Sequence, residues 1–141
     1  MTIKEIQEEI VDEFAMFDDW MERYEYIIEL GKSLPLIEAE DKTEDNIIKG
    51  CQSKVWVQGE LADDLVVFSA DSDAILTKGI IALLLRVFSN QKPQDILDAE
   101  MSFIDEIGLK EHLSATRANG LVSMIKQLKL YAMAFQTKLM Q

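Results

Sequence analysis

Cys51 is the only cysteine in the chain, and its position marks it as a candidate for chemistry. It follows Gly50 in the stretch "NIIKGCQSKVW", residues 46–56, where a polar segment meets an apolar run rich in strand-forming residues. A cysteine that only fills space lies more often inside an apolar periodic segment, where it behaves as a small hydrophobe. A reactive thiol and a buried structural cysteine are therefore both open, and the backbone freedom of the glycine favours the first.

Three other residues bear on the reactivity of this thiol. Lys49 and Lys54 lie near it in sequence, and neighbouring ammonium groups favour the thiolate. His112, the only histidine, would act as the base of a Cys–His enzyme if it met Cys51 in space. Sequence separation does not decide that contact, so an ordinary role for His112 near the start of a helix is equally open.

Other kinds of chemistry find no support in the residue types present. A structural zinc site takes four ligands drawn from Cys and His, and the chain has one of each. The sequence contains no EF-hand loop, no phosphate-binding loop and no dinucleotide-binding glycine motif. We therefore expect no metal site, and we interpret the many acidic residues as solvated helix faces.

Composition and charge limit the kinds of partner that the protein can bind and the cellular compartment in which it works. The chain has 141 residues, a net charge of −12 and 26 acidic against 14 basic residues, which argues against nucleic acid and anionic membranes. The longest apolar run, residues 79–88, is too short for a membrane span and contains Arg86. The acidic, amphipathic N-terminal segment does not resemble a secretory signal. A lone cysteine with no such signal predicts the cytoplasm, where thiols stay reduced.

The elements that must position Cys51 begin with two helices. Thr2 and Glu5 have the spacing of a capping box, and Asp19 followed by Glu22 predicts a second N-cap. Pro35 ends the second helix, and residues 35–50 are predicted to be an ordered loop. Apolar residues at helical spacing mark the buried face of the first helix: Ile3, Ile6, Ile10, Phe14 and Phe17.

A β-hairpin follows the cysteine. The runs "KVWVQGEL" (54–61) and "DLVVFSA" (64–70) are rich in β-branched and aromatic residues and are close enough to pair antiparallel. We expect Trp56 to face the helical layer, with Val55 and Val57 on the opposite face or at an edge.

The remainder of the chain is predicted to be helical. Residues 71–88 are apolar almost all round, which indicates a buried central helix capped by Asp71, Ser72 or Asp73. A short helix starts near Pro93, and a long C-terminal helix presents apolar residues from Leu121 to Leu139. The predicted fold class is α+β, a small antiparallel sheet packed against several helices.

Arg117 is unusually placed for a cation. It falls in the first turn of the predicted C-terminal helix, where the helix dipole disfavours positive charge. A structural salt bridge and recognition of a partner or substrate are both open explanations.

Several stretches, in order along nearly the whole chain, resemble the SufE family of sulfur-acceptor proteins, which includes the CsdE branch. The resemblance is carried by "GCQSKVW" (50–56), "DSDAILTKGIIALLL" (71–85) and "HLSATRANGL" (112–121), with support from "YEYIIELGKSLP" (24–35) and "PQDIL" (93–97). Ala115 departs from the proline that the family often has there, which affects the start of the helix and no chemistry.

The resemblance implies a function in sulfur transfer. Family members bind and stimulate a pyridoxal-phosphate-dependent cysteine desulfurase, SufS- or CsdA-like, and take its persulfide sulfur onto their own cysteine, here Cys51. They pass the sulfur to an Fe–S scaffold, SufBCD in many bacteria. The resemblance thus implies one sulfur-acceptor domain over residues 1–141, no cofactor of its own and no independent enzyme activity. The residues implied to shape the loop or face the partner are Gly50, Gln52, Ser53, Asp73 and Arg117.

Overall fold

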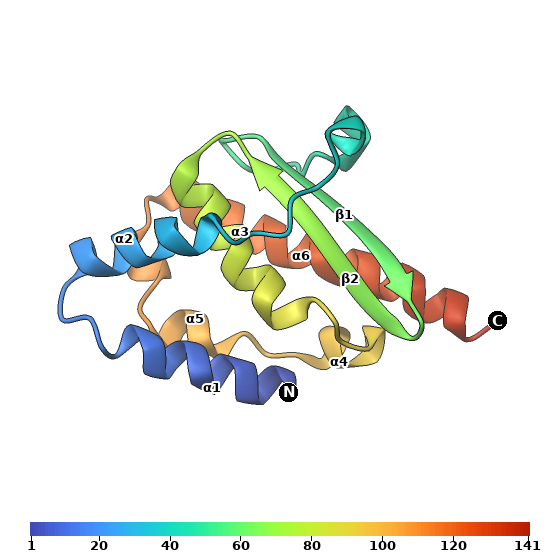
Figure 1. The fold of residues 1–141 in the computed structure, drawn as a ribbon, viewed down its shortest axis with the longest axis horizontal. Helices are drawn as coiled ribbons and strands as arrows, with labels where there is room; N and C mark the ends of the chain where they lie inside the picture. The colour runs from blue at the N-terminus through green and yellow to red at the C-terminus, as the bar shows by residue number, and fades with distance from the viewer.

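The computed structural model describes residues 1–141 and contains six α-helices and one two-stranded antiparallel sheet (Figure 1). This is the α+β class predicted from the sequence. The elements are α1 (Ile3–Phe14), α2 (Trp20–Gly31), β1 (Val55–Ala62), β2 (Leu65–Ser72), α3 (Ile75–Phe88), α4 (Pro93–Asp98), α5 (Ser102–Glu106) and α6 (Ala115–Leu139). Helix α6 runs behind the hairpin and α3 in Figure 1, and it contacts both β1 and α3. No helix combines the length and the apolar character that a membrane span requires.

The first two helices begin where the sequence predicts. Thr2 and Glu5 form a capping box, with each side chain accepting from the backbone N–H of the other at 3.1 and 2.9 Å. Asp19 accepts the Glu22 N–H at 2.9 Å and caps α2. Both predictions are confirmed, because a cap depends only on residues within one turn.

The predicted cap of α3 is wrong. Its N-cap is Ala74, which makes no side-chain cap hydrogen bond. The Asp73 carboxylate accepts the Lys54 N–H at 3.0 Å, and the Ser72 hydroxyl donates to the Lys54 carbonyl at 2.9 Å. Asp71 pairs with Lys42 and Lys78 instead. Ser72 and Asp73 therefore fasten the end of the Cys51 loop to the hairpin, and Asp71 ties the same strand end to Lys42 and to Lys78 of α3.

Helix α3 is the buried centre of the molecule, as predicted. Its apolar residues from Ile80 to Phe88 are almost all inaccessible to solvent. Helix α2 crosses α3 at backbone contact, because a Cβ built on Gly79 would lie 2.1 Å from the Ile27 carbonyl oxygen. Gly31 of α2 also lies against Gly79, because a Cβ added to Gly31 would be 3.0 Å from the Gly79 backbone nitrogen.

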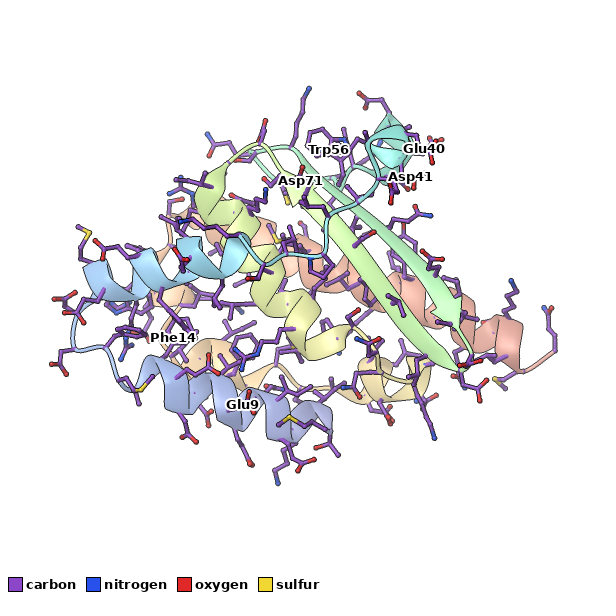
Figure 2. The ribbon with its side chains drawn as sticks, in the orientation of Figure 1. Glu9, Phe14, Glu40, Asp41, Trp56 and Asp71 are labelled. Carbon is purple, nitrogen blue, oxygen red and sulfur yellow. The ribbon has the colours of Figure 1, made fainter.

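The prediction that Trp56 faces the helices is wrong, because the hairpin packs its other face against them. Val55 and Val57 are buried at 0 % and 1 % exposure, whereas Trp56 is half-buried on the other face. Figure 2 shows Trp56 and Asp71 together at one end of the hairpin, near the turn that carries Glu40 and Asp41. The Lys42 ammonium lies 5.2 Å from the centre of the Trp56 ring, so a cation and a loop cover the indole instead of the core.

The inward face of the hairpin is shaped to admit α6. Phe68 of β2 is 1 % exposed and meets Tyr131 of α6 edge-on, with 6.0 Å between the ring centres. Gly59 stands opposite Phe68 in the register, and a Cβ there would lie 3.1 Å from both rings. The Tyr131 hydroxyl donates to the Val57 carbonyl at 3.2 Å.

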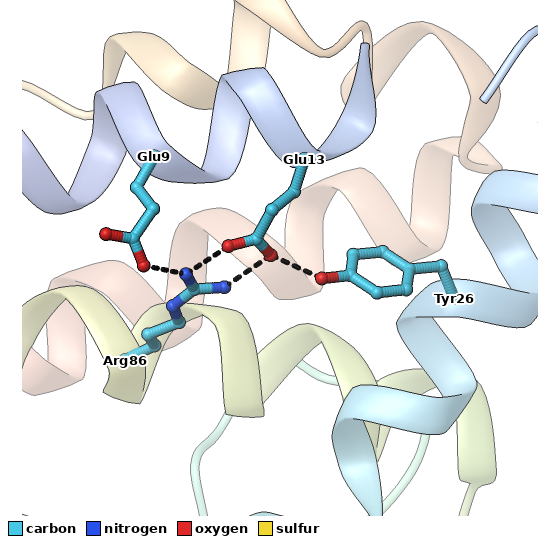
Figure 3. A network of polar contacts seen from close by, with 4 residues as sticks. All are labelled: Glu9, Glu13, Tyr26 and Arg86. Atoms are coloured by element: carbon cyan, nitrogen blue, oxygen red, sulfur yellow. Dashed lines mark hydrogen bonds and ion pairs between the residues drawn. The ribbon is translucent and has the colours of Figure 1, made fainter. Parts of the chain in front are cut away.

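A polar network joins the first three helices at the surface (Figure 3). Arg86 of α3 donates to Glu13 of α1 through two guanidinium nitrogens and to Glu9 of α1 at 2.7 Å. The Tyr26 hydroxyl of α2 donates to the same Glu13 carboxylate. The hydrogen bond from Arg86 is the largest influence on the Glu13 carboxyl and lowers its pKa.

Candidate functional site

Cys51 lies in the loop that leads into β1, with its side chain turned toward α6. Just before it, the Ile48 N–H donates to the Val55 carbonyl at 2.8 Å and closes the loop on itself. The thiol is half-buried and lies 3.6 Å from the Gly120 carbonyl oxygen, to which it can donate. A Cβ built on Gly120 would stand 3.5 Å from Sγ, so this part of α6 has just enough space for the cysteine.

Gly50 is required at its position for two reasons. Its φ of +93° lies in a region that L side chains rarely adopt. A Cβ there would also lie 2.5 Å from the Ser123 hydroxyl oxygen of α6. The residue before the thiol therefore packs directly on the long helix, three residues along from Gly120.

A cavity of about 20 Å³ borders the sulfur. Four of its lining residues are candidates from the sequence, Cys51, Gln52, Ser53 and Arg117, and the structure brings them together. Five more residues complete the lining: Thr77, Ile80, Thr116, Gly120 and Met124. Most of these five belong to 71–85 and 112–121, two of the stretches that carry the family resemblance. The resemblance therefore identified the segments around the cysteine but not the individual side chains that line the cavity.

Asp73 is placed beside the loop and outside this cavity. Its hydrogen bond to the Lys54 N–H holds the end of the cysteine loop against the last residues of β2. Ser123, which contacts Gly50, is a further loop contact that no pattern in the sequence singled out.

The expected electrostatic effect of the two lysines is wrong. Burial is the cause that acts on the Cys51 thiol, and it raises the pKa. Lys49 and Lys54 are both exposed, and water screens their charges. The resting thiol is therefore protonated at neutral pH.

His112 belongs to a different part of the molecule. Its ring stacks on Trp20 with 3.9 Å between the centres, and Nδ1 lies 3.0 Å from the Gly108 carbonyl oxygen. It is absent from the residues that line the Cys51 cavity. The arrangement thus provides no contact on which a Cys–His mechanism would depend.

Arg117 is an exposed cation at the edge of the cavity. Its backbone N–H donates to the Ser114 hydroxyl, the N-cap of α6, at 3.2 Å. None of the ion pairs in the structure includes its guanidinium, so the salt-bridge explanation has no partner. The guanidinium is available to a group that approaches from outside.

These features define a class of protein, an α+β fold that holds a single cysteine in a loop against a long helix. The family model SufE, described as the Fe-S metabolism associated domain, matches residues 8–132. An uncharacterized SufE-like protein of Rhizobium meliloti (strain 1021) is 42% identical over 128 residues, covering 86% of this chain and 91% of the relative. A second SufE-like protein, from Rhizobium etli, is 40% identical over 128 residues, which cover 86% of this chain and 86% of the relative.

The chain belongs to the SufE family, and its role lies in Fe–S metabolism. The fold is also that of a solved structure, the solution structure of a hypothetical protein from Thermus thermophilus. The two superpose with a TM-score of 0.78 over 94% of this chain and 96% of the other, at 18% sequence identity. At that identity the likeness concerns the fold alone.

Proposed function

We propose that this protein is a sulfur acceptor and carrier for Fe–S cluster assembly. Cys51 takes persulfide sulfur from a pyridoxal-phosphate-dependent cysteine desulfurase, stimulates that enzyme and delivers the sulfur to an Fe–S scaffold. The observation that carries the proposal is the placement of the only thiol in a loop, above a small cavity and beside the unpaired Arg117. The pyridoxal phosphate belongs to the partner, and this chain supplies a nucleophile and a surface.

The transfer step needs one cysteine on each protein. The Cys51 thiolate attacks the terminal sulfur of the partner's cysteine persulfide, and a new S–S bond forms as the partner's S–S bond breaks. The partner's cysteine leaves as a thiolate, and Cys51 becomes the persulfide, so no external oxidant or reductant is needed. A second thiol close by would attack the new persulfide and release sulfide, which gives a single cysteine a chemical purpose.

The resting geometry suits storage of sulfur better than its uptake. The half-buried, protonated thiol is a poor nucleophile, so uptake requires the loop to leave α6 and expose Cys51. When the loop returns, the cavity beside Sγ shelters the outer sulfur from small thiols. Gly50 provides the backbone freedom at the base of this movement.

The remaining residues have supporting parts in the proposal. Gln52 and Ser53 shape the loop around the cavity, and Asp73 anchors the end of the loop through Lys54. Arg117 faces the desulfurase. Residues 1–141 act as one sulfur-acceptor domain in the cytoplasm, where a lone thiol stays reduced.

Intact mass after incubation with a cysteine desulfurase and free cysteine tests the proposal. We expect the wild-type chain to gain the mass of one or more sulfur atoms, and a reducing agent to remove it. Cys51→Ser keeps nearly the same size, so it is expected to fold normally and gain nothing. If the serine variant stimulated desulfurase turnover as fully as wild type when acceptor is limiting, Cys51 would not be the acceptor.

A further inference from the structure

The last thirty residues carry the opposite charge from the rest of the chain. All 26 acidic residues lie within residues 1–111, whereas residues 112–141 contain no Asp or Glu. That C-terminal segment carries four cations, Arg117, Lys126, Lys129 and Lys138. Helix α6 is therefore a basic element in a protein whose net charge is −12.

The outward face of α6 is apolar as well as basic. Val122, Leu130 and Met133 are exposed at 50 %, 46 % and 54 %. They lie on the side of the helix away from its buried residues, because their positions are rotated by about a third to half a turn from Leu121 and Leu128. With four further residues they line a groove of about 460 Å³: Lys110, Ile125, Lys126 and Lys129.

The cations around this groove have no acidic partners within the chain. Lys110 and Lys126 are exposed and take part in none of the ion pairs. The Lys129 ammonium donates to the Leu97 and Ala99 carbonyls at 3.4 and 2.7 Å. These bonds hold the aliphatic part of its side chain in place along the side of the groove. No acidic residue lines the groove, so it combines an apolar floor with unpaired positive charge.

We propose that this groove, lined by Val122, Leu130, Met133 and their lysine neighbours, binds an acidic amphipathic helix of a partner protein. From Val122 to Met133 the groove follows α6 for about 16 Å, which is about three helical turns. A helix of that length can place apolar side chains at i, i+4 and i+7 over the apolar strip. Its flanking carboxylates then pair with Lys110 and Lys126.

The charge distribution explains why such a helix binds here. The other 111 residues contain all of the acids, so most of the surface repels an acidic segment and α6 attracts it. Electrostatic complementarity of this kind selects the face and the orientation, and apolar contact supplies the remaining affinity. The groove excludes Gly120 and Ser123, which face the Cys51 loop, so the inference does not depend on the sulfur-acceptor role.

The test uses the full chain and a synthetic helical peptide of about four turns, with Leu at i, i+4 and i+7 and Glu on both flanks. We expect one-to-one binding by titration calorimetry, weakened by salt, with methyl NMR shifts concentrated at Val122, Leu130 and Met133. Lys126→Glu and Leu130→Gln are each expected to weaken binding about tenfold or more. Lys138→Glu, on the same helix and outside the groove, is the matched control and should change binding far less.

Four results would overturn the proposal. They are no binding of the acidic peptide to wild type, equal binding of the same peptide with Lys in place of Glu, shifts centred on another element, and equal weakening by Lys138→Glu. Sedimentation adds one more outcome, because a wild-type dimer broken by Leu130→Gln would make a second copy the occupant. Urea midpoints show that the variants are folded, and Lys126→Gln repeats the charge test with a milder change.

Discussion

At the scale of single residues, burial controls the chemistry of Cys51. Its thiol lies against the Gly120 carbonyl of α6, and loss of hydration disfavours the thiolate, which raises the pKa. A thiol that is neutral at rest reacts slowly with oxidants and with small disulfides. In the proposed cycle, reactivity depends on the loop leaving the helix and not on neighbouring lysines.

Alkylation of Cys51 is therefore expected to depend on pH in a characteristic way. In the folded protein the rate with iodoacetamide should be slower than in urea and should reach its plateau above the ordinary thiol pKa of about 8.5. The unfolded chain releases this proton at lower pH, so the same shift makes stability fall as pH rises through that range. Mass spectra at timed intervals give the rates, and a folded-state profile centred below the ordinary value would contradict the burial argument.

Arg117→Ala is expected to weaken desulfurase binding more than folding. The exposed guanidinium makes no ion pair within the chain, so its loss should cost at most about 1 kcal/mol of unfolding free energy. A lost charged contact at an interface costs about 2–5 kcal/mol in binding. Titration calorimetry and urea melts measure both, with Lys138→Ala as the control. Normal binding together with an early melt would make Arg117 a structural residue.

At the scale of elements, the hairpin and the crossing helices determine which side chains reach the core. Strands with apolar residues on both faces do not show in sequence which face is inward. In β1 the inward set is Val55, Val57 and Gly59, and in β2 it includes Phe68. The small residues on β1 leave room for the Phe68 and Tyr131 rings.

Phe68→Ala is expected to destabilise the protein more than Trp56→Ala. Phe68 is 1 % exposed, and emptying such an aromatic site costs about 3–5 kcal/mol. Trp56 is half-buried under a loop and a lysine, so we expect about 1–2 kcal/mol from its partial burial and its cation–π contact. Urea midpoints of the two variants give the order, and a larger loss for Trp56→Ala would mean that the face carrying Trp56, not the face carrying Phe68, packs against the helices.

Gly79→Ala tests the crossing of α2 and α3. In an open helix this change stabilises by about 1 kcal/mol, because alanine has the higher helix propensity. Here the added Cβ would lie 2.1 Å from the Ile27 carbonyl oxygen, so the helices must separate. Overpacking typically costs about 1–3 kcal/mol, and backbone contact places this site at the upper end. A variant as stable as wild type would show that α2 and α3 do not touch at this glycine.

At the scale of the whole molecule, one polar network around Glu13 connects α1, α2 and α3. Arg86 and Glu13 are separated by 73 residues, and Tyr26 adds α2 to the same carboxylate. The pair is partly shielded, with 28% and 22% of the two side chains exposed. The Glu9 side chain is 48% exposed and contacts the same guanidinium, so the two glutamates can be compared as a more exposed and a less exposed partner of one arginine.

Glu13→Gln is expected to cost about 1.5–3 kcal/mol at neutral pH, because it removes hydrogen bonds to a charged group. Glu9→Gln, at the more exposed position, should cost at most about 1 kcal/mol. The lowered pKa of Glu13 fixes the sign of the pH effect: its contribution is full above the unfolded pKa and disappears as pH falls through the folded one. Urea melts from neutral pH down to about pH 3 should show wild type and Glu13→Gln converging. A constant difference would contradict the ion-pair explanation.

The sequence by itself determined the features that depend on near neighbours. The Thr2 and Asp19 caps form as predicted because donor and acceptor lie three residues apart. The central helix follows from a run that is apolar almost all round, and the C-terminal helix follows from its apolar spacing. Cys51 is identified because no other thiol exists. The family motifs also selected most of the segments that meet around the cysteine.

Tertiary structure decided which surface each residue meets. Trp56 turned outward because Val55 and Val57 fit against the helices, a choice that strand alternation leaves open. Asp73 binds the Lys54 backbone instead of capping α3, since the hairpin brings those strand ends together. The pKa of Cys51 is raised by burial against α6, where its thiol meets the Gly120 carbonyl 69 residues away in sequence, whereas the exposed Lys49 and Lys54, close in sequence, do not offset that burial.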